Sequence, residues 1–162
     1  MTSVQLHLAL THVPVILSIT GLLMLIVSFF IKNNVLLKIS YTLLVVSAIA
    51  ALPVYFTGEG AEEVVEHLPG VSEPLIEEHE EVAKMGLISI IVAGILALAA
   101  FFANRWKNVS KILNVAVLAA ALVTGGLMAR TAHLGGQIRH SEIRDGNLAQ
   151  ADENSQEDGD GE

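Results

Sequence analysis

Six histidines stand at or just beyond the ends of the long apolar segments of this chain, where imidazoles could bind a metal ion or a haem. They are His7, His12, His67, His79, His133 and His140, and the last two bracket a Gly-Gly pair in RTAHLGGQIRH. The chain has no cysteine, which excludes disulfides, zinc–thiolate sites and covalent haem attachment. Any metal or haem must therefore be held by imidazole, thioether, carboxylate or main-chain oxygen.

The spacing of the histidines limits which of them can share one iron. His7 and His12 are five residues apart and would point about 140° apart on a helix, whereas His133 and His140 would differ by about 10 Å in depth. A haem bound by two histidines needs imidazoles at matched depth on facing helices. We therefore expect cross-helix pairs, His12 with His133 at the deeper level and His7 with His140 at the shallower one.

The neighbours of these histidines suit a haem. Gly135 and Gly136 lack side chains, so a flat macrocycle could approach the main chain there. Arg130 and Arg139 could pair with the haem propionates.

A non-haem site for zinc, copper or iron is the alternative, because glutamates surround His67 and His79. Its candidate ligands are His7, His12, His79, His140, Glu62, Glu63 and Glu78. No E-x-x-H step, H-E-x-x-H, Walker loop, G-x-S-x-G or Rossmann fingerprint is present. No hydrolase or transferase activity is predicted, and a redox role stays open.

Four apolar segments must position these residues. They cover residues 8–31, 39–58, 85–104 and 112–129, each close to the 20 or so residues that cross a bilayer. They lack the polar stripe of a water-facing helix. The expected fold is an all-α, up-down-up-down four-helix transmembrane bundle over residues 1–141, with helices at about 7–31, 35–57, 75–104 and 109–134.

The loop charges predict the orientation of the bundle. Lys32 and Lys38 lie in the first short loop, and Arg105, Lys107 and Lys111 lie in the third. The positive-inside rule places both loops in the cytoplasm. The two termini, the 59–84 segment and every histidine are then extracytoplasmic. No acidic or basic residue falls within the central part of a span, which argues against an ion path.

Two regions outside the spans have their own character. AEEVVEHL, before Pro69-Gly70, predicts a short amphipathic helix in the central loop. Residues 142–162 are acidic and polar, which is typical of a disordered tail. The net charge of −8 and the small basic loops disfavour binding of nucleic acid.

Four stretches, LHLALTHVPVIL, TGEGAEE, EEHEEVA and HLGGQIRH, resemble the bacterial membrane protein family called domain of unknown function 2231. The likeness covers about residues 5–141 and implies four helices in a bacterial plasma membrane. The matching positions are His7, His12, Pro14, Thr57, Gly58, His79, Gly135, Gly136 and His140. Leu8 and Val13 depart from the family pattern, and His67 and His133 are not part of it. The family name implies no chemistry.

Three functions are compatible with these features. The first is binding of haem b near the extracytoplasmic face, with electron transfer to a redox partner protein on that side. The second is binding of zinc, copper or iron by histidines and glutamates. The third is a cofactor-free structural or accessory membrane subunit, whose polar outer cluster would be a hydrogen-bonded cap or a partner surface. The lipid bilayer surrounds the helices in all three cases. The oligomeric state is not specified by the sequence.

Overall fold

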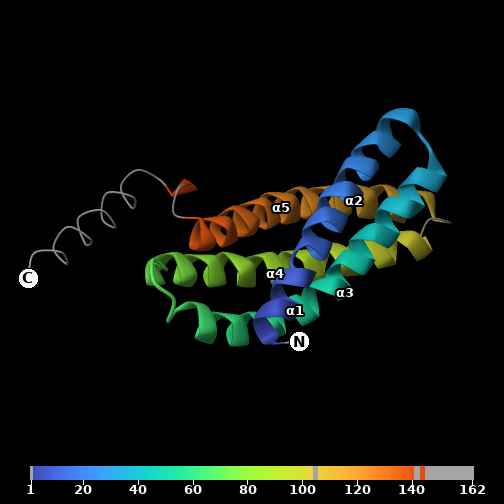
Figure 1. Ribbon diagram of the computed structural model, residues 1–162. Coiled ribbons are helices and arrows are strands. Elements are labelled where there is room, and N and C mark those ends of the chain that lie inside the picture. Colours follow the sequence, from blue (N-terminus) through green and yellow to red (C-terminus); the bar gives the residue numbers. More distant parts are fainter. Residues whose placement is uncertain (1, 104–105, 141–142, 145–162) are drawn as a thin grey trace, which may run out of the picture.

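The computed structural model describes residues 2–103, 106–140 and 143–144, with the side chains of Lys107 and Arg139 left out. Its helices are α1 (Ser3–Leu10), α2 (His12–Ile31), α3 (Asn34–Val65), α4 (Glu73–Ala103) and α5 (Lys107–Arg139). α1 and α2 follow one another end to end, so the fold consists of four long rods (Figure 1). All four are long and apolar enough to cross a membrane, which confirms the expected all-α bundle.

The break between α1 and α2 has a local cause. Pro14 has no main-chain N–H to donate to the carbonyl of Leu10, so one hydrogen bond of the helix is missing. Thr11, at the break, keeps right-handed helical angles, and its N–H still donates to His7 O at 2.9 Å. The chain therefore continues in nearly the same direction, and His7 and His12 belong to successive helices of one rod.

α3 differs from the expectation, because it does not end near residue 57. The separate short helix expected at AEEVVEHL is not formed, and α3 continues through Gly58 and Gly60 to Val65. A glycine within a helix costs only about 1 kcal/mol relative to alanine. Gly60 packs against Ser3 of α1, and Ala61 is buried, so packing offsets this cost. Gly70, with φ +76°, then turns the chain toward α4.

α5 is also longer than expected. The sequence indicated an end near residue 134, but the helix runs straight through Gly135 and Gly136 to Arg139. Arg144 holds this end in place. Its Nε donates to Gln137 O at 3.0 Å, and its Nη2 donates to Gly70 O at 2.7 Å. Apart from Ile143 and Arg144, the expected tail at 142–162 lies outside the described residues.

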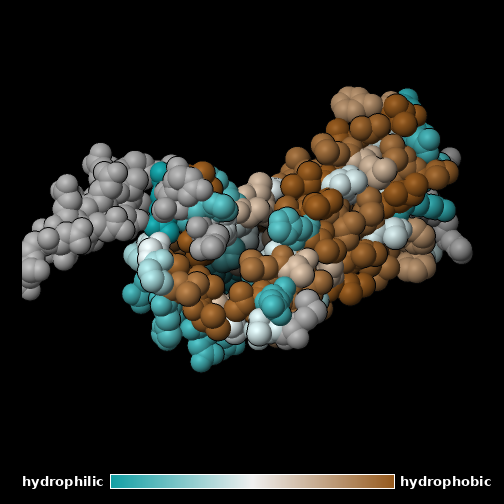
Figure 2. Space-filling model, viewed as in Figure 1, coloured by the Kyte–Doolittle hydropathy of each residue, from teal (hydrophilic) through white to brown (hydrophobic). Residues whose placement is uncertain are grey.

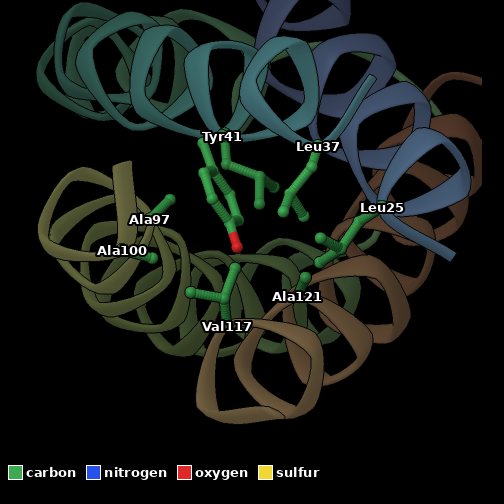
Figure 3. Packing of buried hydrophobic residues seen from close by; sticks show 8 residues of the cluster. Leu25, Leu37, Tyr41, Ala97, Ala100, Val117 and Ala121 are labelled. Atoms are coloured by element: carbon green, nitrogen blue, oxygen red, sulfur yellow. The ribbon is translucent and has the colours of Figure 1, made fainter. Parts of the chain in front are cut away.

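Small residues let the helices pack closely. In Figure 3, Leu37 and Tyr41 of α3 reach toward Val117 and Ala121 of α5, and all four are buried. The largest core cluster consists of Leu25, Leu37, Tyr41, Leu44, Ala97, Ala100, Val117 and Ala121.

Along the rods, many apolar residues face outward, such as Phe30, which is 82% exposed. Figure 2 shows this apolar surface along the rods, with hydrophilic residues mainly at the two ends.

The two ends of the bundle differ in charge. At one end α2 meets α3 and α4 approaches α5, and the sequence there carries Lys32, Lys38 and Lys111 (Figure 1). We call this the basic end. The other end holds α1, the close of α3, the start of α4 and the close of α5, and it carries the histidines. We call it the histidine end. Which end faces the cytoplasm stays a prediction from the loop charges.

Candidate functional site

His7 of α1 binds the main chain of α3. Its Nδ1 lies 3.0 Å from the carbonyl oxygen of Val54, and the ring is partly buried. The Thr57 hydroxyl stands 3.4 Å from the same nitrogen. The ring lies over Gly58, where an added Cβ would be 3.5 Å from Cε1 of His7. Because a carbonyl oxygen can only accept, the hydrogen bond requires a proton on Nδ1, so in the neutral ring the lone pair is on Nε2.

His79 of α4 makes the same arrangement with α5. Its Nδ1 lies 3.1 Å from the carbonyl oxygen of Thr131, and the ring is again partly buried. An added Cβ on Gly135 would stand 3.2 Å from Cε1 of His79. This carbonyl likewise selects the Nδ1–H tautomer. In the neutral form of each ring, Nε2 is then free of the proton that a metal would have to displace.

The contacts of His7 with α3 and of His79 with α5 share one geometry. In each, the histidine binds the carbonyl of one residue and packs on a glycine four positions later, Val54 with Gly58 and Thr131 with Gly135. Helical side chains lean toward the N-terminus, so the side chain four residues on would cover that carbonyl. A glycine leaves it open to the imidazole. The glycines are visible in the sequence. Their role is not, because the sequence does not show which carbonyl a histidine binds.

The surroundings of His79 affect its protonation. His79 lies in the glutamate-rich start of α4, about two turns before the apolar segment that begins at Met85. Burial lowers the pKa of His79, and the nearby His7 lowers this pKa further, while the hydrogen bond to Thr131 opposes both effects. His79 is therefore biased toward the neutral imidazole, which is the form that binds metals.

The other histidines lie in different surroundings. His12, His67, His133 and His140 are all exposed. His12 lies 3.4 Å from the Thr11 hydroxyl, and His67 lies 3.6 Å from the Glu66 carboxylate. His7 lies close enough to His79 to influence its pKa. The pairs expected from the spacing, His7 with His140 and His12 with His133, stay predictions.

The candidate glutamates are dispersed. Glu62 is half-buried, and burial together with the nearby Glu80 raises its pKa. Glu63 is exposed, and Glu78 is bound by Arg130 at 2.6 Å. In the described part of the chain, no three histidine, aspartate or glutamate side chains come close enough together to hold a metal ion.

The arginines are engaged with the protein itself. Arg130 pairs with Glu78, and Arg144 donates to main-chain oxygens near the end of α5 and at Gly70. The side chain of Arg139 lies outside the described residues. Gly136 stands against Ile143, which would be 3.5 Å from an added Cβ. Of the two glycines at this position, only Gly135 touches an imidazole.

These features define the class of the molecule: a multi-pass α-helical membrane protein with two main-chain-anchored histidines at one end of its bundle. The chain belongs to the family described as "Predicted membrane protein (DUF2231)", whose model matches residues 3–142. This match confirms the resemblance seen in the sequence. No curated protein and no solved structure matches the chain.

Proposed function

We propose that the protein binds haem b through His7 and His79 near the extracytoplasmic face of the membrane, where the haem passes electrons to a partner protein. The observation that carries this proposal is the matched anchoring of the two rings. The Nδ1 atom of each imidazole donates a hydrogen bond to a main-chain carbonyl, at 3.0 and 3.1 Å. The Nε2 atom then remains as the nitrogen that could bind iron. The same arrangement fixes metal-binding histidines and increases their basicity.

The number of ligands favours haem over a non-haem metal. Zinc and non-haem iron sites take three or more protein ligands, whereas a porphyrin supplies four and leaves two axial positions. The described residues offer a pair of half-buried imidazoles and no group of three candidate ligands. Two imidazoles from different helices would match this pair of positions.

The residues around the two histidines differ in how well they would accommodate a haem. When bound, haem supplies a one-electron redox couple. Thr57 stands beside His7, and Gly58 and Gly135 leave room for each ring against its helix. Arg130 already pairs with Glu78, so a propionate would have to compete with that carboxylate for the guanidinium. The lipid bilayer surrounds the apolar rods in this proposal.

An absorption spectrum of the purified protein tests the proposal. The protein should be expressed with ample haem, purified in detergent and measured in the oxidised and reduced states. A Soret band and a sharp reduced α band, with the pyridine haemochrome of haem b, are expected. Absence of a Soret band would overturn the proposal. Stoichiometric copper without haem would replace it with a copper(I) site on the same two imidazoles.

A further inference from the structure

A second polar site lies at the basic end of the bundle, far along the rods from the histidines. It is a notch of about 170 Å³ between the close of α2, the start of α3 and one position of α5. The notch has room for several water molecules or a small oxyanion. Its lining residues are Ser28, Phe29, Lys32, Asn33, Asn34, Leu37 and Asn114.

Asn33 and Asn114, which line the notch, use their amide oxygens in hydrogen bonds. Asn33 Oδ1 accepts from the N–H groups of Val35 and Leu36 at 2.9 and 3.1 Å, which caps α3. Asn114 Oδ1 accepts from the hydroxyl of Tyr41 at 2.5 Å. With both amide oxygens occupied, the Nδ2 groups remain as donors. Within residues 2–103, 106–140 and 143–144, no acceptor binds these Nδ2 groups.

Lys32 adds a positive charge to the notch. It has φ 51° at the close of α2, the left-handed conformation that ends the helix, and its N–H donates to Ser28 O. Its ammonium makes no ion pair within the described residues. The sequence has no aspartate or glutamate in residues 1–58 or 82–141, so no acidic residue near in sequence neutralises this end.

Exposed apolar side chains border the polar notch, as acyl chains border the headgroup of a lipid. Phe30 and Ile31, just before Lys32, are 82% and 58% exposed, and Val35, just after it, is 68% exposed. These apolar side chains would lie against acyl chains, while the lysine and the amides stand at the level of the headgroups. A free anion would use the donors but not this apolar border.

We infer that the notch binds the phosphate group of an anionic phospholipid. Lys32 supplies the charge, and the Nδ2 groups of Asn33 and Asn114 supply neutral hydrogen-bond donors. Such charge-assisted contacts are shorter and stronger than neutral ones. This site is independent of haem, since it lies at the opposite end of the bundle from His7 and His79.

Native mass spectrometry of the detergent-solubilised protein tests the inference. Phosphatidylglycerol and phosphatidylcholine with identical acyl chains are the probes. Phosphatidylglycerol should be retained preferentially, and Lys32→Gln should weaken its binding by about tenfold, as expected for one charge-assisted hydrogen bond. Asn33→Asp should weaken it as well, because aspartate keeps the helix cap but replaces the amide donor with a negative charge.

Lys38→Gln is the matched control. Lys38 is exposed at the same end but lies over the Phe101 ring, 5.8 Å from its centroid, and does not line the notch. An exposed charge away from the notch should change binding by less than about twofold. Equal retention of the two lipids, or equal effects of Lys32→Gln and Lys38→Gln, would overturn the inference.

A competition experiment separates the two sources of phosphate. Persistence of bound phosphatidylglycerol in millimolar inorganic phosphate supports the lipid as the ligand. Displacement of the lipid by inorganic phosphate would instead assign the notch to the free anion. The unfolding temperature of each variant should be measured in the same detergent. An unchanged value shows that a loss of binding does not reflect a loss of fold.

Discussion

His79 packs against Gly135 so closely that an added Cβ would stand 3.2 Å from the Cε1 atom of the ring. The contact follows from the hydrogen bond between His79 and the Thr131 carbonyl, one turn earlier on α5. His7 repeats the arrangement on α3, with more space, since an added Cβ on Gly58 would lie 3.5 Å from its ring. Two helices thus present an open carbonyl to an imidazole.

Replacement of either anchored histidine should abolish haem binding. His7→Ala and His79→Ala each remove one proposed axial ligand, so we expect the reduced α band to disappear. His12→Ala and His133→Ala are the controls, because both side chains are exposed. If His12→Ala or His133→Ala abolished the band while His7→Ala did not, the deeper pair inferred from spacing would be the correct one.

Gly135→Ala should disturb His79 more than Gly58→Ala disturbs His7. At 3.2 Å the imidazole must shift by a few tenths of an ångström, whereas 3.5 Å is an ordinary contact. We expect Gly135→Ala to reduce haem retention or shift the Soret band. Gly126→Ala has nothing within 4 Å of the added Cβ and should stabilise the helix by roughly 0.5–1 kcal/mol. Equal spectra for all three variants would contradict this role of Gly135.

Gly94 sets the distance between α3 and α4. An added Cβ would stand 2.7 Å from the Cβ of Ala48, and both atoms are attached to rigid main chain. We expect Gly94→Ala to destabilise the protein by about 1–3 kcal/mol, the usual cost of overpacking. Adding Ala48→Gly should restore part of this loss. Thermal unfolding in detergent measures both changes, and purely additive losses would show that the two positions do not interact.

Arg144 joins the end of α5 to the turn after α3. Its guanidinium donates to Gln137 O, Ile138 O and Gly70 O, and the side chain is buried. We expect Arg144→Ala to cost about 1–3 kcal/mol, because three buried or partly buried carbonyl hydrogen bonds would be lost. Faster proteolysis near Gly70 should accompany the loss. Arg144→Lys should recover little, since one ammonium cannot reach all three oxygens.

The haem-free protein should lose stability as the pH falls. The pKa of His79 is lowered in the fold, so near pH 6.5, the ordinary value, the unfolded chain binds more protons than the folded one. The free energy of unfolding should then rise with pH through this range and fall as the pH drops toward the folded pKa. Unfolding curves at several pH values check this slope. His79→Gln should flatten it, whereas His67→Gln, at an exposed site, should not.

The sequence alone was sufficient for the membrane architecture and the family. Four uncharged segments of sufficient length leave few folds open, since every main-chain polar group in a bilayer must be satisfied within the segment. The separation of lysines from histidines along the chain also predicted two chemically different ends. Residue types and the likeness to the family also identify His7, His79 and Gly135 as candidates.

Only the tertiary structure showed which main-chain carbonyls hold His7 and His79. His7 and His79 are anchored by the carbonyls of Val54 and Thr131, and a main-chain oxygen has no signature in a sequence. α3 and α5 are longer than the sequence predicts for a related reason. Glycines that usually end a helix can lie within one when a neighbouring helix packs on them, as Ser3 does on Gly60 and His79 on Gly135. Helix packing, which local sequence does not encode, therefore determines that His7 and His79 are each held against a neighbouring helix.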